Sequence, residues 1–311
     1  SQWRSSVAKE LQRMGLNMNN WRISTANAKY EVCNVYPSSF VLPSQIGDEQ
    51  AFGIAQCRRK GKIPVLSWAN GNCSFLLRCS QLNALEDDMT GFFDATRSKD
   101  DELLAKSVFG MSQTDALNIV DMGKSGDFPQ DAYTGFYVNC KFFPLGMPDD
   151  SALKEALSSL SSACASIDEY RSAGAWLEAV AQTKWLDHIW LMVNNASKLA
   201  NKLVNETESV VVQNVSGDGI LTGFCALIQV LADPFYRTIH GLAVLIEKEF
   251  VAFGHKFGSF TGKKEDDPYS AVFLAFLDGV WQAIQLYPLS FEYSGSLLLA
   301  IIGAVQSCQF G

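Results

Sequence analysis

The stretch from Ser209 to Ala232 reads SVVVQNVSGDGILTGFCALIQVLA, and its pattern changes twice. The β-branched run at 210–212 is typical of a central strand. Glycine and polar residues over 213–221 predict a loop, and apolar residues recur at helical spacing from Thr222 onward. A buried strand, a loop of small residues and a helix N-terminus together favour a backbone cradle for an anion. The alternative is a strand-to-helix connection that only maintains the fold.

The usual phosphate-binding motifs are absent from this loop. Gly217, Gly219 and Gly223 form G-x-G-x-x-x-G, which misses the dinucleotide spacing, and no Gly-Lys-Ser/Thr follows. A third kind of phosphate loop uses C-x5-R, in which a thiolate attacks phosphorus while arginine and loop amides hold the oxygens. None of the eight cysteines has an arginine six positions later. Cysteine-based phosphatase chemistry is therefore absent in its usual form.

Other segments predict strands that alternate with helices, followed by long helices. We expect strands over 30–37, 63–68, 75–78 and 116–120, with a turn at Asn70-Gly71. We expect helices over 7–14, 49–59 with Asp48 as its cap, after Asp149, and over 186–203, 222–232, 237–253 and 269–287. This order favours one α/β or α+β domain over residues 1–311. We expect it to be cut from a longer chain.

Composition excludes several classes of protein. The 311 residues are 48% hydrophobic and 19% charged, which favours a packed globular protein over disorder. A net charge of −8 argues against nucleic acid as a partner. Three histidines and no C-x-x-C pair predict no metal and no cofactor. The longest apolar run, Leu297–Val305, is too short to cross a membrane, and free buried thiols favour a cytoplasmic location.

The distribution of charge is uneven. Between Lys202 and Arg237 there is no Lys, Arg or His, although Glu206, Glu208 and Asp218 lie within this span. A loop that binds phosphate normally has a cation beside its amides. The predicted anion cradle therefore lies in the stretch of the sequence where cations are missing.

Ordered motifs along nearly the whole chain resemble the myotubularin family of phosphoinositide 3-phosphatases. The motifs are Trp21–Ser24, Gly61–Trp68, Arg78–Gln81, Trp185–Ile189, Asp233–Ile239, Leu245–Glu249 and Phe253–Phe257. The resemblance implies a cysteine-based phosphatase-like fold, with a central mixed sheet flanked by helices. It also implies a link to endosomal membranes.

The catalytic loop departs from the pattern of active members, which read His-Cys-Ser-Asp-Gly-Trp-Asp-Arg-Thr. This chain has Asn214, Val215, Ser216, Gly217, Asp218, Gly219, Ile220, Leu221 and Thr222 at the corresponding positions. Val215 replaces the nucleophile, Leu221 replaces the phosphate-binding arginine, and Gly217 and Ile220 replace the two acids. A second family segment, Asp-Ala-Arg-Pro, reads Asp121-Met122-Gly123-Lys124 and lacks its arginine.

These departures predict a catalytically inactive member, a pseudophosphatase. The resemblance implies an adaptor or regulator that pairs with active myotubularin relatives in endosomal phosphoinositide metabolism. One alternative is a phosphoinositide-binding module without turnover, and a second is a regulatory domain of a larger exchange factor for small GTPases. An active lipid phosphatase is the least favoured alternative.

One basic cluster is the candidate contact for a lipid head group or a membrane surface. It consists of Arg58, Arg59, Lys60 and Lys62. Cations grouped in this way attract anionic head groups. The alternative interpretation is a solvated helix end with no ligand.

Overall fold

The computed structural model describes residues 2–83, 99–112, 114–124, 137–170, 172–257 and 269–307. The chain forms two compact units, neither of which is a continuous stretch of sequence. Unit 1 comprises residues 1–146, 199–221 and 252–254, and unit 2 comprises residues 147–198, 222–251 and 255–311. The expectation of one domain over 1–311 stays a prediction.

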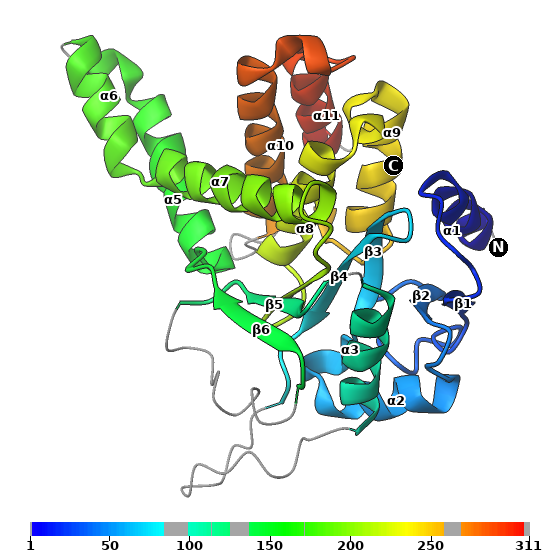
Figure 1. The fold of residues 1–311 in the computed structure, drawn as a ribbon. Coiled ribbons are helices and arrows are strands. Elements are labelled where there is room, and N and C mark those ends of the chain that lie inside the picture. Colours follow the sequence, from blue (N-terminus) through cyan, green and yellow to red (C-terminus); the bar gives the residue numbers. More distant parts are fainter. Residues whose placement is uncertain are drawn as a thin grey trace, which may run out of the picture. The chain divides into compact units, whose positions relative to one another are not determined.

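A five-stranded mixed sheet lies in unit 1 (Figure 1). Its strands, in spatial order, are β3 (Val65–Asn70), β4 (Ser74–Ser80), β7 (Val210–Asn214), β5 (Leu117–Asp121) and β6 (Cys140–Pro144). β3 and β4 form the predicted antiparallel hairpin, and the other neighbouring strands are parallel. The β-branched strand β7 is central, as predicted, and its residues 210–213 are buried. Side chains 0–4% exposed at 210–212 form the middle of the core of this unit.

The strand expected over 30–37 is wrong. These residues form bends, with Tyr30 at a φ of 60°. The buried Asn27 explains the difference, because its amide takes the place of a neighbouring strand. Its Nδ2 donates to the carbonyls of Cys33 (2.8 Å) and Pro37 (3.0 Å), and its Oδ1 accepts from the Cys33 amide (3.0 Å). A short antiparallel pair that the sequence analysis missed, β1 (Trp21–Ser24) and β2 (Phe40–Pro43), flanks this loop.

Among its described residues, unit 1 also contains the helices α1 (Gln2–Arg13), α2 (Asp48–Cys57) and α3 (Lys99–Met111), the short 3-10 helix Arg59–Gly61 and the last residues of α7. α3 packs against β5 and α2. The cap predicted for α2 is wrong, since the N-cap is Gly47, whose amide donates to Gln50 Oε1 at 2.8 Å. The Asp48 carboxylate instead accepts from Arg22 (2.6 Å) and Ser24 (2.8 Å), and these bonds lower the pKa of Asp48.

Unit 2 is helical in its described residues. Its helices are α5 (Asp150–Ala165), α6 (Ala173–Gln182), most of α7 (Trp185–Val204), most of α8 (Ile220–Ala232), α9 (Ile239–Ile246), α10 (Tyr269–Leu286) and α11 (Gly295–Ser307). Asp149 caps α5 as predicted, because its side chain accepts from the Ala152 amide at 2.7 Å. The α/β class with a mixed sheet and flanking helices is confirmed. Among the described residues, no helix has the length and apolar character needed to span a bilayer.

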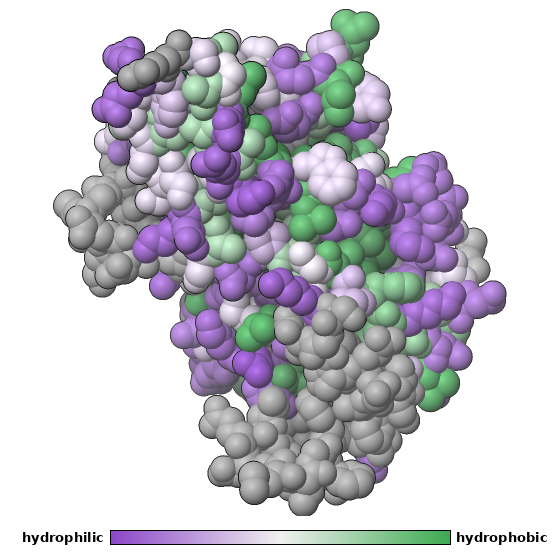
Figure 2. Space-filling view, turned by 90° about the vertical axis from the view of Figure 1, so that its left-hand side faces the viewer, coloured by the Kyte–Doolittle hydropathy of each residue, from purple (hydrophilic) through white to green (hydrophobic). Residues whose placement is uncertain are grey.

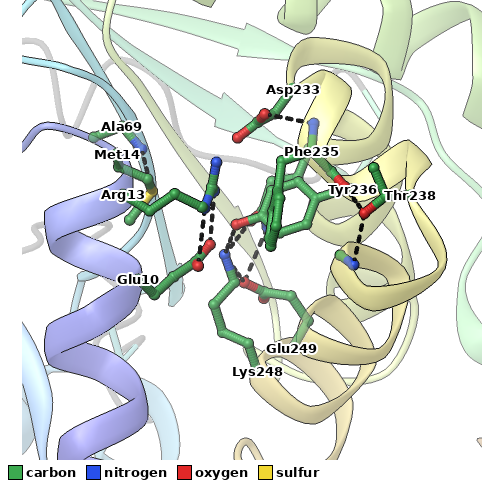
Figure 3. A network of polar contacts seen from close by, with 12 residues as sticks. Glu10, Arg13, Met14, Ala69, Asp233, Phe235, Tyr236, Thr238, Lys248 and Glu249 are labelled. Atoms are coloured by element: carbon green, nitrogen blue, oxygen red, sulfur yellow. Dashed lines mark hydrogen bonds and ion pairs between the residues drawn. The ribbon is translucent and has the colours of Figure 1, made fainter.

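The segment after α8 contains capped turns and the buried side chain of Tyr236 (Figure 3). Asp233 accepts from the Phe235 amide at 3.0 Å, and Thr238 accepts from the Gly241 amide at 2.9 Å. The helix expected over 237–253 therefore starts only at Ile239, and it becomes a π-helical turn over Glu247–Val251. Lys248 Nζ donates to Tyr236 Oη at 2.6 Å, which orders this turn.

Candidate functional site

The loop predicted as an anion cradle leaves the carboxyl end of the central strand. β7 pairs in parallel with β4 and with β5, so Gln213 lies opposite Cys79 on one side and Asp121 on the other. The chain then turns through 215–219 and enters α8 at Ile220. The carboxyl ends of parallel strands are where open α/β sheets bind ligands. The predicted order of strand, loop and helix is therefore confirmed, and the use of this loop as an anion cradle stays a prediction.

Hydrogen bonds of Asn214 and two glycines with positive φ, Gly217 and Gly219, fix the conformation of the loop. Asn214 Oδ1 accepts from the Gly217 amide at 2.6 Å, and its Nδ2 donates to the Asp218 carbonyl at 3.0 Å. Gly217 has a φ of 68°. A Cβ atom there would lie 2.8 Å from Lys62 Cδ and 2.9 Å from Ser80 N. Any side chain at this position, including the acid of active relatives, would thus displace its neighbours.

The Asp218 carboxylate forms an ion pair with the Lys62 ammonium inside the loop. The Lys62 side chain is only 1% exposed, and Lys60 Nζ lies 3.8 Å from the same carboxylate oxygen. Burial raises the pKa of Asp218, but the charge and hydrogen bond of Lys62 outweigh this and lower it below 3.8. Burial lowers the pKa of Lys62 despite the charge of Asp218. The Lys62 ammonium, which could pair with a bound phosphate, is therefore already paired with the Asp218 carboxylate of the same chain.

Hydrocarbon side chains stand at the two positions that the resemblance assigns to the nucleophile and the arginine, Val215 and Leu221. Val215 is 51% exposed, but its side chain is a hydrocarbon. Leu221 is completely buried, with Ile220 and Thr222 at 3% exposure. Ser216 donates a hydrogen bond to Asp218 and contributes to lowering its pKa. Within the described segments, no three His, Cys, Asp or Glu side chains come together as metal ligands would.

Arg58 is buried in a second ion pair, with Asp101. The guanidinium donates from Nε to Oδ1 (2.9 Å) and from Nη2 to Oδ2 (2.7 Å), and both side chains are at most 4% exposed. Its Nη1 donates to the Ser80 carbonyl (2.6 Å) and to Gln213 Oε1 (3.1 Å). Such a bidentate pair uses the full fork of the arginine. Little of Arg58 is left for a ligand.

The four predicted binding cations are therefore in different situations. Arg58 and Lys62 are buried and paired, so the interpretation of a solvated helix end is wrong for these two residues. Lys60 is 61% exposed, and Arg59 is partly buried. Contact of this cluster with a lipid stays a prediction, and Lys60 is its most accessible member.

The sequence analysis missed the polar network behind the loop. Asp121 Oδ2 accepts from Gln81 Nε2 (2.7 Å) and Gln213 Nε2 (3.1 Å), and its Oδ1 accepts from the Gly123 amide (2.8 Å). Tyr137 donates to Asp101 from the other side. A polar residue at the end of each buried strand was the available signal, because such residues must find partners. These hydrogen bonds give the buried polar groups at the carboxyl ends of the strands partners within the chain.

A central parallel strand, a glycine loop and a helix N-terminus form a layout that α/β domains use to bind anions. The model of the myotubularin-like phosphatase domain matches residues 2–311. The chain therefore belongs to this family.

Relatives of known name support the assignment over the same length. Myotubularin of Xenopus laevis is 32% identical over 316 residues, which covers 97% of this chain and 51% of that protein. Myotubularin of Rattus norvegicus is 31% identical with the same coverage. The phosphatidylinositol-3,5-bisphosphate 3-phosphatase MTMR8 of Homo sapiens is 32% identical, covering 96% of this chain and 43% of that protein. The chain thus spans about half the length of the curated relatives it matches.

Proposed function

We propose that this chain is a catalytically inactive phosphoinositide 3-phosphatase-like domain, an adaptor or regulator of active myotubularin relatives. The observation that carries the proposal is the ion pair of Asp218 with the buried Lys62 in the loop after β7. A phosphate monoester in that loop would meet a carboxylate instead of a cation. Like charges a few ångströms apart repel strongly in a partly buried site.

The chemistry of the loop supports the same proposal. Hydrolysis through a phosphoenzyme needs a nucleophile, and Val215 supplies none. The developing charge on the phosphoryl oxygens needs donors fixed in place, and Leu221 is a buried hydrocarbon at the arginine position. Removal of one such donor typically costs a factor of about 10² to 10³ in rate. Loss of both groups, together with the added Asp218 charge, leaves no route for turnover.

A phosphate-release assay tests the loss of activity. The substrate is a soluble short-chain phosphoinositide with a 3-phosphate, and a heat-inactivated sample of the same chain is the control. We expect wild-type release to equal the control. Release above the control that disappears in Asp218→Asn or another loop variant would overturn the proposal.

A rescue variant tests whether only the reactive groups are missing. We expect phosphate release by the Val215→Cys, Leu221→Arg double variant to equal that of the control. Asp218 would still be paired with Lys62, and Gly217 and Ile220 would still stand where active relatives have acids. A guanidinium at the buried position 221 should also destabilise the fold. Circular dichroism separates failure to fold from failure to catalyse. Strong phosphatase activity in a folded double variant would contradict the proposal that the Asp218–Lys62 pair prevents phosphate binding.

The adaptor role concerns an active relative as partner, in the cytoplasm and at endosomal membranes. The test mixes the purified chain with purified full-length myotubularin and measures both mass and activity. We expect a complex by light scattering and a rise in the phosphatase activity of the partner. If the partner elutes alone and its activity is unchanged, the adaptor role fails while the loss of catalysis can still hold.

A phosphoinositide-binding module without turnover is the second candidate, favoured by the exposed ammonium of Lys60 beside the loop. Titration with a soluble 3-phosphorylated head group tests it. Lys60→Gln should weaken binding several-fold, whereas Lys184→Gln, a change at a lysine of similar exposure in unit 2, should not. The absence of saturable binding to the wild type would exclude the module. The remaining alternative is a regulatory domain of a larger exchange factor for small GTPases, which is equally compatible with this loop. The full-length sequence distinguishes this alternative from the other two.

A further inference from the structure

A groove of about 430 Å³ lies among four helices of unit 2. Its lining residues come from α5, α7, α10 and α11, and they are nearly all apolar. Ligand pockets typically have volumes of about 300–1,000 Å³ and apolar walls with a few polar groups. Figure 2 shows hydrophobic side chains (green) that reach the surface between hydrophilic ones (purple) on one face of the molecule. The groove thus has the size and the walls of a site for a small, largely apolar molecule.

Among the described residues that line this groove, Asp278 alone is charged. Its Oδ2 accepts from Trp185 Nε1 at 2.7 Å, and its Oδ1 accepts from Gln282 Nε2 at 3.0 Å. Both donors are neutral, and no cation of the described residues pairs with this carboxylate. Lys184, which precedes Trp185 in the sequence, pairs with Asp187 instead, at 3.2 Å. Since a carboxylate offers about four acceptor positions, Asp278 can accept further hydrogen bonds.

Two indole rings belong to the walls of the same groove. Trp185 is 3% exposed, and its bond to Asp278 fixes its orientation. Trp281 is 42% exposed, and its indole lies so close to Gly295 that a Cβ there would be 3.1 Å from Cδ1. The face of an indole ring attracts cations through its quadrupole. The carboxylate and the indoles therefore favour the same charge on a ligand, which is positive.

We propose that this groove binds a small amphiphilic amine, a molecule with an apolar body and one protonated amino group. The ammonium pairs with Asp278, and the apolar body lies along aliphatic side chains that include Leu160, Leu277 and Ile302. A carboxylate in apolar surroundings without a cation is unfavourable, and the ammonium of the ligand removes this cost. The lining residues all belong to unit 2, so the proposal does not depend on the loss of catalysis at the loop after β7.

Isothermal titration calorimetry with three ten-carbon compounds tests the charge of the ligand on the unaltered chain. Decylamine is protonated at neutral pH, as a lysine side chain is, whereas 1-decanol is neutral and decanoate is negative. We expect decylamine to bind at a single site and at least tenfold more tightly than decanol, with decanoate the weakest. Hexylamine should bind more weakly than decylamine, because each methylene group that is buried contributes about 0.8 kcal/mol.

An exchange of one acid for its amide locates the site. Asp278→Asn removes the negative charge but keeps an acceptor for the Trp185 indole. It should weaken decylamine binding about tenfold, to the level of decanol, and leave decanol binding unchanged. Asp168→Asn is the matched control, since Asp168 is exposed and lies outside the groove. It should leave the affinities for both compounds unchanged. Circular dichroism checks that both variants fold, and the comparison of the three compounds needs no variant at all.

Three results would overturn the proposal. The first is the absence of saturable decylamine binding to the wild type. The second is equal affinity for the amine, the alcohol and the carboxylate, which would make the groove an apolar surface without charge selection, as a contact for a partner helix would be. The third is an equal loss of decylamine affinity in Asp278→Asn and Asp168→Asn, which would show binding to acidic surface groups in general.

Discussion

In unit 1, charged side chains lie at the carboxyl ends of the parallel strands and the loop over 215–219, a region we call the loop edge. In unit 2, helix α11 (Gly295–Ser307) carries none. At the loop edge, Arg58, Lys62, Asp101 and Asp218 are largely buried and pair with one another. In unit 2, all residues of α11 except Leu298 are exposed or half-buried. The comparison teaches that charged groups at the loop edge already have partners within the chain, whereas α11 presents apolar side chains without any charge of its own.

The largest expected effect comes from breaking the buried pair at the loop edge. Arg58→Met would leave Asp101 buried without its cation and should cost about 3–5 kcal/mol of stability. The control is Arg22→Met, which breaks the more exposed pair with Asp48, whose side chain is 47% exposed. We expect that change to cost about 1 kcal/mol or less. Urea denaturation measures both, and equal losses would show that the pair with Asp101 is not specially stabilising.

A smaller effect should come from filling the space at Gly217. Gly217→Ala forces a Cβ into a positive φ and against Lys62 and Ser80, at a cost of about 1–3 kcal/mol. Gly110→Ala is the control, because Gly110 is exposed in α3 and a Cβ there would meet nothing within 4 Å. It should stabilise the chain by up to about 1 kcal/mol. If thermal unfolding shows Gly217→Ala to be neutral, the loop is less tightly packed than its contacts indicate.

The smallest expected effect is the pH dependence of the Asp218 pair. Because the folded-state pKa of Asp218 is lowered, the stability from this carboxylate is present above its unfolded value and is lost as pH falls through the folded value. The difference in stability between wild type and Asp218→Asn should thus be constant at neutral pH and shrink below pH 3.8. Urea unfolding at several pH values measures it. A difference that grows on acidification would contradict the lowered pKa.

Local patterns were sufficient for much of the fold. The β-branched run at 210–212 and the periodicity after Thr222 correctly predicted the central strand and α8. The hairpin of β3 and β4 followed from two strand-like runs on either side of the turn at Asn70-Gly71. Patterns failed where one side chain outside a segment fixes its backbone, as Asn27 does for residues 30–37. They also failed for β1 and β2, which are only four residues long.

For the candidate site, too, local sequence was sufficient for some features and insufficient for others. The sequence by itself determined which reactive groups are missing, because a valine at 215 and a leucine at 221 cannot act as a thiolate or a guanidinium in any fold. Only the tertiary structure decided which cations are available. Lys62 and Asp218 are 156 positions apart, and Arg58 and Asp101 are 43 apart. Burial and pairing depend on which strands and loops meet at one edge of the sheet, and residue identity alone carries no such information.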